Sequence, residues 1–162
     1  MLIRPASAAD APALAAIEAV CFPAAEAASP TSIAARLAVF PDCFFVAEEA
    51  GQPIGFINGA VWDEPVIRDE LFENAALHRP DGAWQTVFGL DVLPEYRRQG
   101  VAAALMRALL DAARAAGRRG AVLTCKAHLI RYYERFGYQN LGVSASVHGG
   151  AVWYDMLLEF GE

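Results

Sequence analysis

The segment from Gly89 to Leu105, which reads GLDVLPEYRRQGVAAAL, constrains the fold of this chain more than any other. Its first residues form an apolar strand that ends at Pro94, and a turn rich in arginine and glycine follows. The turn leads directly into a helix predicted over residues 100–116, which Gly117 ends. We expect the apolar face of this helix to consist of Val101, Leu105, Ala108, Leu109 and Ala112. So short a turn places the start of the helix at the end of the strand.

The start of this helix has the chemistry of an anion-binding cradle. The amide groups of a first helical turn have no helical partners, and the helix dipole adds partial positive charge there. Gly100, Ala102 and Ala103 are small enough for a phosphate to approach the backbone, and Arg97 and Arg98 add full charges. The alternative is an ordinary glycine N-cap beside surface arginines. The strand, the proline and the long helix together favour phosphate binding.

The spacing within the segment narrows the class of phosphate ligand. The Gly-Lys-Ser or Gly-Lys-Thr of a P-loop does not occur in it, and neither does the Gly-x-Gly-x-x-Gly of a dinucleotide fold. The large class that remains is the diphosphate of coenzyme A.

Composition and charge exclude several other classes of protein. The chain has 162 residues, of which 56% are hydrophobic and 20% charged. This balance predicts a single domain over residues 1–162 with a real core, and it excludes a disordered chain. The net charge of −6 argues against a nucleic-acid partner, and no apolar run is long enough for a membrane helix. The N-terminus lacks a signal-peptide pattern, so we expect a soluble, cytoplasmic protein.

The three cysteines give no sign of a disulfide framework or a metal site. Cys21, Cys43 and Cys125 are far apart and form no Cys-x-x-Cys pair. We therefore expect reduced, buried thiols and no bound metal.

The remaining elements predict an α+β domain built on a mixed sheet. Asp10 is placed to cap a first helix with apolar residues Leu14, Ile17 and Val20, and Ser29-Pro30 starts a second helix. Shorter helices are predicted near residues 69–74 and over 129–136. Strands are predicted over residues 2–5, 43–48, 53–62, 84–93, 121–125, 138–146 and 152–160.

With these pieces in place, the sequence resembles the GNAT superfamily of N-acetyltransferases. The signature Gln/Arg-x-x-Gly-x-Gly/Ala is matched by Arg97-x-x-Gly100-x-Ala102, and the segment LIRYYERFGY at residues 129–138 is similar to a second family segment. Within the superfamily, residues 88–92, 123–125 and 132–136 look most like the arylalkylamine N-acetyltransferase group. The resemblance implies a mixed, mostly antiparallel central sheet flanked by helices, with acetyl-CoA as the acetyl donor.

The resemblance also implies roles for individual residues. The backbone of Leu90, Asp91 and Val92 would pair with the pantetheine arm of coenzyme A. The pyrophosphate would be held by the amides of Arg98, Gln99, Gly100, Val101, Ala102 and Ala103, with Arg97 adding charge. Tyr133 would protonate the departing thiolate, because a phenol with a pKa near 10 is a weaker acid than a thiol. The alternative for Tyr133 is a core aromatic residue.

The sequence departs from the arylalkylamine group at the base that deprotonates the amine. Thr86 and Phe88 stand at the positions of that group's histidines, and neither can act as a base. His148, in the turn before the last strand, is one candidate, and a solvated turn histidine is its alternative. Glu26, between the first two helices, would bind the ammonium group, and Phe22 would line the acceptor pocket. His78 is expected in a surface loop.

These expectations converge on an N-acetyltransferase that acts on a small primary amine in a ternary complex. Two alternatives stay open: a non-catalytic acyl-CoA sensor on the same fold, and an acetyltransferase for protein N-termini or lysines. Residues 1–80 carry 4 basic and 11 acidic side chains, whereas residues 81–162 carry 9 and 8. The acidic half suits a cationic amine, and the other half suits an anionic donor. The oligomeric state is open between a monomer and a homodimer.

Overall fold

The computed structural model describes residues 1–161 and contains two hydrogen-bonded sheets with helices on both sides. The strands are β1 (Leu2–Pro5), β2 (Phe44–Glu49), β3 (Gln52–Asn58), β4 (Val61–Trp62), β5 (Trp84–Val87), β6 (Gly89–Val92), β7 (Gly120–Cys125), β8 (Gln139–Val143) and β9 (Tyr154–Glu159). The α-helices are α1 (Ala11–Cys21), α2 (Pro30–Val39), α3 (Asp69–Glu73), α4 (Val101–Ala115) and α5 (Ile130–Glu134). Short 3-10 turns include η4 (Pro94–Tyr96), η5 (Ala127–Leu129) and η6 (His148–Gly150).

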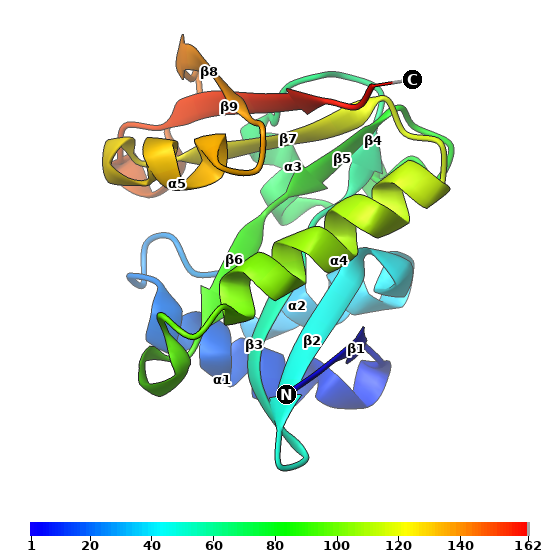
Figure 1. Ribbon diagram of the computed structural model, residues 1–162, viewed down its shortest axis with the longest axis vertical. Helices are drawn as coiled ribbons and strands as arrows, with labels where there is room; N and C mark the ends of the chain where they lie inside the picture. The colour runs from blue at the N-terminus through cyan, green and yellow to red at the C-terminus, as the bar shows by residue number, and fades with distance from the viewer. Residues whose placement is uncertain (162) are drawn as a thin grey trace.

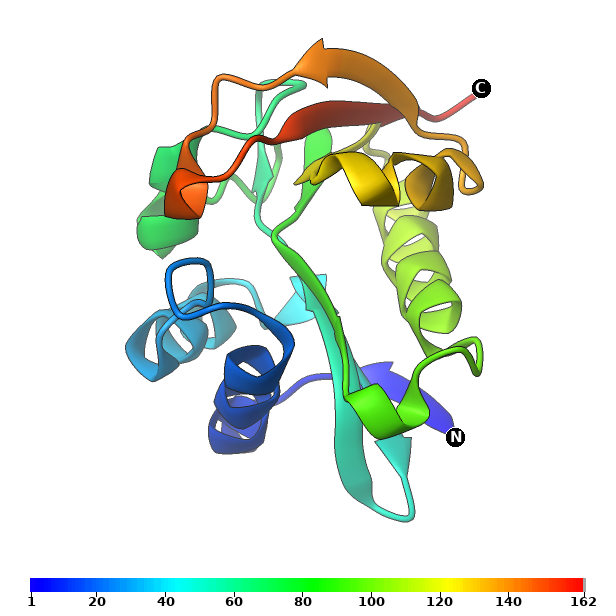
Figure 2. The ribbon, with the colours of Figure 1, turned by 90° about the vertical axis from the view of Figure 1, so that its left-hand side faces the viewer.

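The two sheets follow one another along the molecule (Figure 1). The first has the order β1-β2-β3-β6 and is antiparallel throughout. The second has the order β4-β5-β7-β9-β8, in which only the β5–β7 pair is parallel. Figure 2 shows α1 and α2 on one face of the first sheet and α4 on the other. The predicted α+β class with a mixed, mostly antiparallel sheet flanked by helices is confirmed.

Two strands predicted as continuous are each divided between the sheets. The strand predicted over residues 53–62 becomes β3 and β4, and the one predicted over 84–93 becomes β5 and β6, with Phe88 between them. The chain crosses at Gly59, where an added Cβ would lie 1.9 Å from the Thr86 carbonyl oxygen. β5 pairs with β7, whereas β6 pairs with β3 instead. A gap therefore opens between β6 and the end of β7. No local sequence pattern predicts this gap.

The first helix differs in detail from its prediction. The Asp10 carboxylate accepts hydrogen bonds from the Arg4 guanidinium and the Ser7 amide, and it makes none to the amides of α1. Val20 is 58% exposed, whereas Glu18 is buried on the sheet-facing side with Leu14 and Ile17. Residues 14, 17 and 18 follow the i, i+3, i+4 spacing of one helical face, and Val20 lies off that face.

The other long helices begin and end as predicted. The Ser29 hydroxyl accepts the Ser32 amide at 3.1 Å at the start of α2. Gly117 follows α4 with a φ of +79°, a conformation that favours glycine. The buried face of α4 consists of Val101, Leu105, Met106, Leu109, Leu110 and Ala113. The predicted Ala108 and Ala112 lie at its half-buried margin. Among residues 1–161, no helix combines the length and apolar character needed to cross a membrane.

Candidate active site

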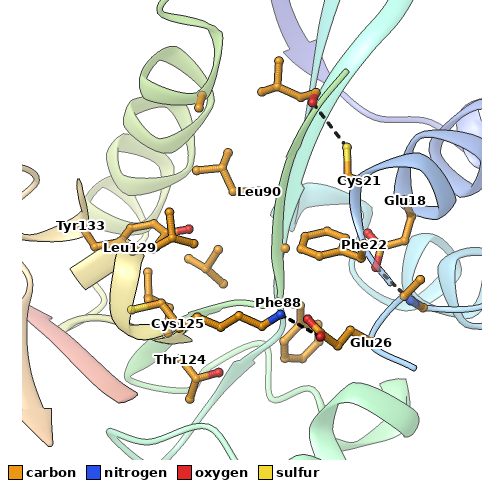
Figure 3. Close-up of a pocket in the computed structure, with 18 of the residues that line it drawn as sticks. Glu18, Cys21, Phe22, Glu26, Phe88, Leu90, Thr124, Cys125, Leu129 and Tyr133 are labelled. Carbon is orange, nitrogen blue, oxygen red and sulfur yellow. Dashed lines mark hydrogen bonds and ion pairs between the residues drawn. The ribbon is translucent and has the colours of Figure 1, made fainter. Parts of the chain in front are cut away.

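A cavity of about 1010 Å³ passes through the gap between β6 and β7. Figure 3 shows Leu129, Cys125 and Tyr133 on one side of β6, and Cys21, Phe22 and Glu18 on the other. Most of the predicted site residues line this cavity: Leu90, Val92, Arg97, Arg98, Gly100, Val101, Ala102, Ala103, Tyr133, Phe22, Glu26 and His148. Asp91 and Gln99 do not line it. The tertiary structure thus brings the predicted donor and acceptor residues into one space.

The start of α4 offers a row of free backbone donors to this cavity. Within residues 1–161, the amides of residues 98–103 donate to no protein acceptor, and the first intrahelical bond runs from Ala104 to the Gly100 oxygen. Gly100 has a φ of +82° and Arg98 has a φ of +62°, so the turn directs successive amides outward. Such a nest of amides at a helix N-terminus fits a diphosphate group.

The side chains of this turn have divided roles. Arg97 Nε donates to the Val92 carbonyl oxygen at 2.9 Å, which fastens the turn to the end of β6. Gln99 Nε2 donates to the Glu95 carbonyl oxygen at 3.2 Å, away from the cavity. Arg98 lines the cavity and makes no ion pair with the described residues. Arg98 is therefore the guanidinium that remains free to meet an anion.

The outer edge of β6 faces the gap. In an antiparallel ladder, alternate residues direct their backbone groups to the partner strand. The Leu93 amide donates to the Ile54 oxygen of β3, so Gly89 and Asp91 also face β3, whereas Leu90 and Val92 turn their backbone groups outward. The Val92 oxygen already accepts from Arg97 and from the Cys21 thiol, leaving Leu90 as the open position. This edge can pair with one extended, amide-bearing ligand.

Tyr133 lies on α5 within an aromatic group. Its ring makes edge contacts with Tyr132 at 5.3 Å and with Tyr138 at 6.1 Å between centroids. Burial raises the pKa of the Tyr133 phenol well above its usual value, with nearby Cys125 adding to the shift, so the hydroxyl keeps its proton at neutral pH. Burial also raises the pKa of Cys125 to about 11, so that thiol stays neutral.

Aromatic rings form the walls of the cavity on the side of α1 and α2. Phe72 from α3 lies 5.1 Å from Phe88 and 4.8 Å from the His148 ring, centroid to centroid. The Arg36 guanidinium lies 4.7 Å from the centre of the Phe88 ring, and Lys126 Nζ lies 5.7 Å from that of Trp153. Flat apolar walls with cationic edges favour an apolar or aromatic ligand in this chamber.

The α1–α2 loop and the β8–β9 loop are fastened together over this chamber. Glu26 Oε2 pairs with Lys126 Nζ at 2.9 Å, and the Glu26 carbonyl accepts from His148 Nε2 at 2.9 Å. Trp153 Nε1 donates to the His148 carbonyl at 2.8 Å. We call these four residues the clasp. Because Lys126 pairs with the Glu26 carboxylate and His148 Nε2 donates to the Glu26 carbonyl, two of the three predicted substrate-binding residues are already engaged in holding the chamber closed.

The histidine positions of the arylalkylamine group carry no base here. Thr86 is fully buried, and its hydroxyl donates to the Ala60 carbonyl at 2.7 Å, while Phe88 forms a wall of the cavity. His78 is half-buried rather than in an open loop, because its Nδ1 accepts the Val61 amide at 2.9 Å. Burial lowers the pKa of His78 and keeps it neutral. His78 therefore supports β4.

The structure adds two acidic side chains to which sequence reasoning gave no role; the backbone of Asp91, predicted to pair with the pantetheine arm, faces β3 instead. Glu18 is 5% exposed and lines the cavity, and Asp91 is fully buried beside it on the α1 side of β6. Burial and the adjacent Glu18 carboxyl raise the pKa of Asp91 well above its usual value. A glutamate at the i+4 position from Leu14, on the apolar face of α1, was the available sequence signal. Among residues 1–161, no cluster of ligands could hold a metal ion.

Comparison with known families gives one match over most of the chain. The sequence model of the acetyltransferase (GNAT) family matches residues 11–138. Serotonin N-acetyltransferase from Mesocricetus auratus is 32% identical over 109 residues, which cover 67% of this chain and 51% of that protein. N-acetyltransferase 8 from Homo sapiens is 30% identical over 105 residues, which cover 63% of this chain and 40% of that protein. The chain thus spans about half or less of the length of these relatives.

Solved structures share the fold over nearly the full length. A GNAT-like decarboxylase, GphF, in complex with isobutyryl-CoA superposes with a TM-score of 0.81 at 22% identity, covering 98% of this chain and 99% of the other. The yncA protein of Salmonella typhimurium, a putative acetyltransferase solved with acetyl-CoA, gives a TM-score of 0.73 at 21% identity, covering 100% and 95%. At these identities the likeness establishes the fold.

Proposed function

The chain belongs to the acetyltransferase (GNAT) family, and we propose that it transfers the acetyl group of acetyl-CoA to a small primary amine by direct attack in a ternary complex. One observation carries the proposal: a single cavity joins the amide cradle of α4 to an aromatic chamber, with Tyr133 on its wall. Donor and acceptor bound in one cavity can react without a covalent enzyme intermediate.

On the donor side, the free amides of residues 98–103 and the unpaired Arg98 bind the diphosphate of acetyl-CoA. The outward backbone groups of Leu90 pair with the amides of the pantetheine arm, as a further strand would. Asp91 contributes backbone only to β3, and its side chain faces α1. The gap between β6 and β7 admits the arm toward Tyr133.

On the acceptor side, the chamber favours a small amine that carries an apolar or aromatic group. Phe22, Phe72, Phe88 and Trp153 supply flat walls. The clasp closes one side of the chamber, which leaves less room for a peptide than an open groove would. Serotonin N-acetyltransferases are among the similar proteins, and their name agrees with this class of acceptor.

In the reaction, Tyr133 holds the proton that the departing thiolate needs. The pKa of a phenol already lies above that of a thiol, and burial raises the pKa of Tyr133 further, so the proton is present at neutral pH. As the amine nitrogen bonds to the thioester carbon, the carbon–sulfur bond breaks, and the phenol donates its proton to sulfur. The proton that the new amide nitrogen loses restores the phenol.

A thiol-release assay with acetyl-CoA and a panel of acceptors tests the proposal. The panel comprises arylalkylamines, polyamines, amino acids, aminoglycosides and an N-terminal peptide. We expect release with arylalkylamines and little with the peptide. Release with the peptide alone would favour a protein acetyltransferase.

The second candidate, a non-catalytic acyl-CoA sensor, is favoured by one observation: Thr86 and Phe88 provide no base. Calorimetric titration with acetyl-CoA, performed beside the release assay, separates the two functions. Tight binding without release toward any acceptor would overturn the transferase proposal and support the sensor.

A further inference from the structure

Two carboxyl groups are buried side by side where α1 packs against β6. Glu18 is 5% exposed, and Asp91 is fully buried. A Cβ built on Gly89 would lie 2.9 Å from Asp91 Oδ1 and 3.6 Å from Glu18 Oε1, so both oxygens border the space that this glycine leaves free. Within residues 1–161, Glu18 Oε1 and both Asp91 oxygens are buried and have no hydrogen-bond partner. Two carboxylates can only accept, so a proton on one of them would supply the missing donor.

The surroundings decide which carboxyl holds that proton. Glu18 Oε2 accepts the Ala28 amide at 2.9 Å. Within residues 1–161, neither Asp91 oxygen has a hydrogen-bond donor. Burial raises the pKa of Asp91 well above its usual value. Asp91 is therefore the carboxyl group of the pair that holds a proton.

The charges around the pair leave room for one more cation. From α2, Arg36 is buried and donates to Asn58 Oδ1 at 3.2 Å and to the Phe72 carbonyl at 2.8 Å. From α1, Cys21 stays a neutral thiol, because burial raises its pKa. Arg36 is a cation whose charge acts on both carboxyl groups. One cation facing two carboxyls can be joined by one further positive charge, either a proton or an ammonium.

Only one member of the pair reaches the cavity. Glu18 lines it next to Phe22 and Phe88, whereas Asp91 is absent from its walls. Figure 3 shows Glu18 on the acceptor side of β6, directed toward Phe22 and opposite the side that carries Tyr133. An amine entering the aromatic chamber therefore meets the carboxyl group of Glu18, which is 5% exposed.

We propose that Glu18 is the catalytic base that removes a proton from the ammonium form of the acceptor, and that Asp91 is a positioning residue that donates a hydrogen bond to Glu18. This inference rests on the proposed function. The ammonium transfers one proton to the Glu18 carboxylate and becomes a free amine. Its nitrogen bonds to the thioester carbon, the carbon–sulfur bond breaks, and sulfur receives the second nitrogen proton by way of Tyr133. Glu18 returns its proton to solvent, so each turnover releases one proton, one amide and one thiol.

The pH dependence of turnover tests the role of Glu18. For wild-type protein, kcat/KM for an alkylamine reaches a plateau at a pH below the pKa of the amine. In Glu18→Gln, we expect kcat at neutral pH to fall about 10²-fold. We also expect kcat/KM to rise about tenfold per pH unit up to the amine's pKa, because only the free amine reacts. An aromatic amine that is already neutral at the assay pH restores most of the rate to this variant.

Controls separate this loss from misfolding. Glu18→Asp keeps a carboxylate and should retain a wild-type pH profile at reduced kcat. Glu159→Gln removes an exposed carboxyl on β9 outside the cavity and should change nothing. Acetyl-CoA affinity of Glu18→Gln should stay within about twofold of wild type. Two outcomes would overturn the inference while leaving the proposed function intact. One is a wild-type pH profile of kcat/KM in Glu18→Gln. The other is that His148→Gln, and not Glu18→Gln, loses the wild-type dependence of kcat/KM on pH at the acid end of the profile.

Two further measurements test the role of Asp91. Asp91→Ala removes the proposed donor to Glu18, so the fall of kcat/KM at acid pH should begin at a higher pH. Asp91→Asn can donate a hydrogen bond again, so this fall should return toward its wild-type pH. The infrared difference spectrum of wild type minus Asp91→Asn at neutral pH should contain the carbonyl band of a protonated carboxylic acid. This measurement needs no turnover, so an absent band rejects the shared proton even if no acceptor is found.

Discussion

At the scale of single residues, burial distinguishes two adjacent tyrosines of the cavity wall. Tyr132 and Tyr133 are adjacent in sequence, and both line the cavity. Burial raises the pKa of each, but the shift at Tyr133 is the larger, and Cys125 beside it adds to the effect. The raised pKa keeps the Tyr133 hydroxyl protonated at neutral pH, as a proton donor to the departing thiolate must be.

Replacing Tyr133 with phenylalanine tests this assignment. We expect kcat to fall about 10²-fold, because the thiolate leaves without a proton, while the Kd for acetyl-CoA changes by less than about twofold. Stopped-flow thiol release and calorimetric titration measure the two quantities. Tyr154→Phe on β9, outside the cavity, is the matched control. If Tyr132→Phe shows the loss instead, the acid has been assigned to the wrong ring.

At this scale, the sequence predicted more of the donor side of the site than of the acceptor side. The sequence order alone places Gly100, Ala102 and Ala103 at the start of a helix, where the free amides follow from helical geometry. Glu26 and His148 also line the cavity as expected. Their engagement by Lys126 and by each other could not be predicted, because these contacts join residues about a hundred positions apart.

At the scale of elements, the turn before α4 carries the proposed donor site. Gly100 and Gly117 stand at the two ends of α4, with φ values of +82° and +79°, and an added Cβ meets nothing within 4 Å at either. The two positions therefore impose the same backbone strain on a substituted residue, about 1–2 kcal/mol. Only one of them faces the cavity.

Substituting glutamate at each glycine separates cradle chemistry from helix stability. Gly100→Glu should abolish measurable acetyl-CoA binding, because it adds negative charge beside the diphosphate. Gly117→Glu should lose a similar amount of thermal stability and bind acetyl-CoA normally. Calorimetric titration and thermal melting of both variants provide the comparison. If the two variants bind acetyl-CoA equally well, the N-terminus of α4 is not the diphosphate site.

Element prediction succeeded where the signal is local and failed where strands change partners. Ser29-Pro30 and Gly117 mark helix ends by their own chemistry, and both were placed correctly. The breaks at Gly59 and Phe88 were missed, because the sequence pattern of an apolar strand is the same whichever strand it pairs with. Val20 was wrongly assigned to the buried face of α1, because the sheet that covers this helix fixes which side is inward.

At the scale of the whole molecule, the clasp joins distant parts of the chain around the acceptor chamber. Lys126 lies at the end of β7, and Glu26 lies in the α1–α2 loop. The Glu26 side chain is 9% exposed and that of Lys126 is 34% exposed, so the pair is partly shielded from water. Such a pair stabilises more than a surface pair does, and breaking it leaves a nearly buried carboxylate without its partner.

Replacing Lys126 with methionine should loosen the chamber. We expect KM for the acceptor amine to rise about threefold to tenfold and the rate with bulkier acceptors to increase, while acetyl-CoA affinity is retained. Steady-state kinetics over an acceptor series of increasing size measures both effects. Arg119→Met, which breaks the exposed pair with Glu159, is the control. If KM and the largest acceptor that is accepted are both unchanged, the clasp does not form a wall of the acceptor site.

The sequence by itself determined the α+β class and the membership of a family of acetyltransferases, and it predicted the cradle at the start of α4. These depend on local order, since a strand, a turn and a helix start are consecutive residues. The tertiary structure alone decided that β6 leaves β7 to form the gap, that Lys126 engages Glu26, and that Glu18 meets Asp91. Each of these depends on distant segments being packed together, and burial then raises the pKa of Asp91.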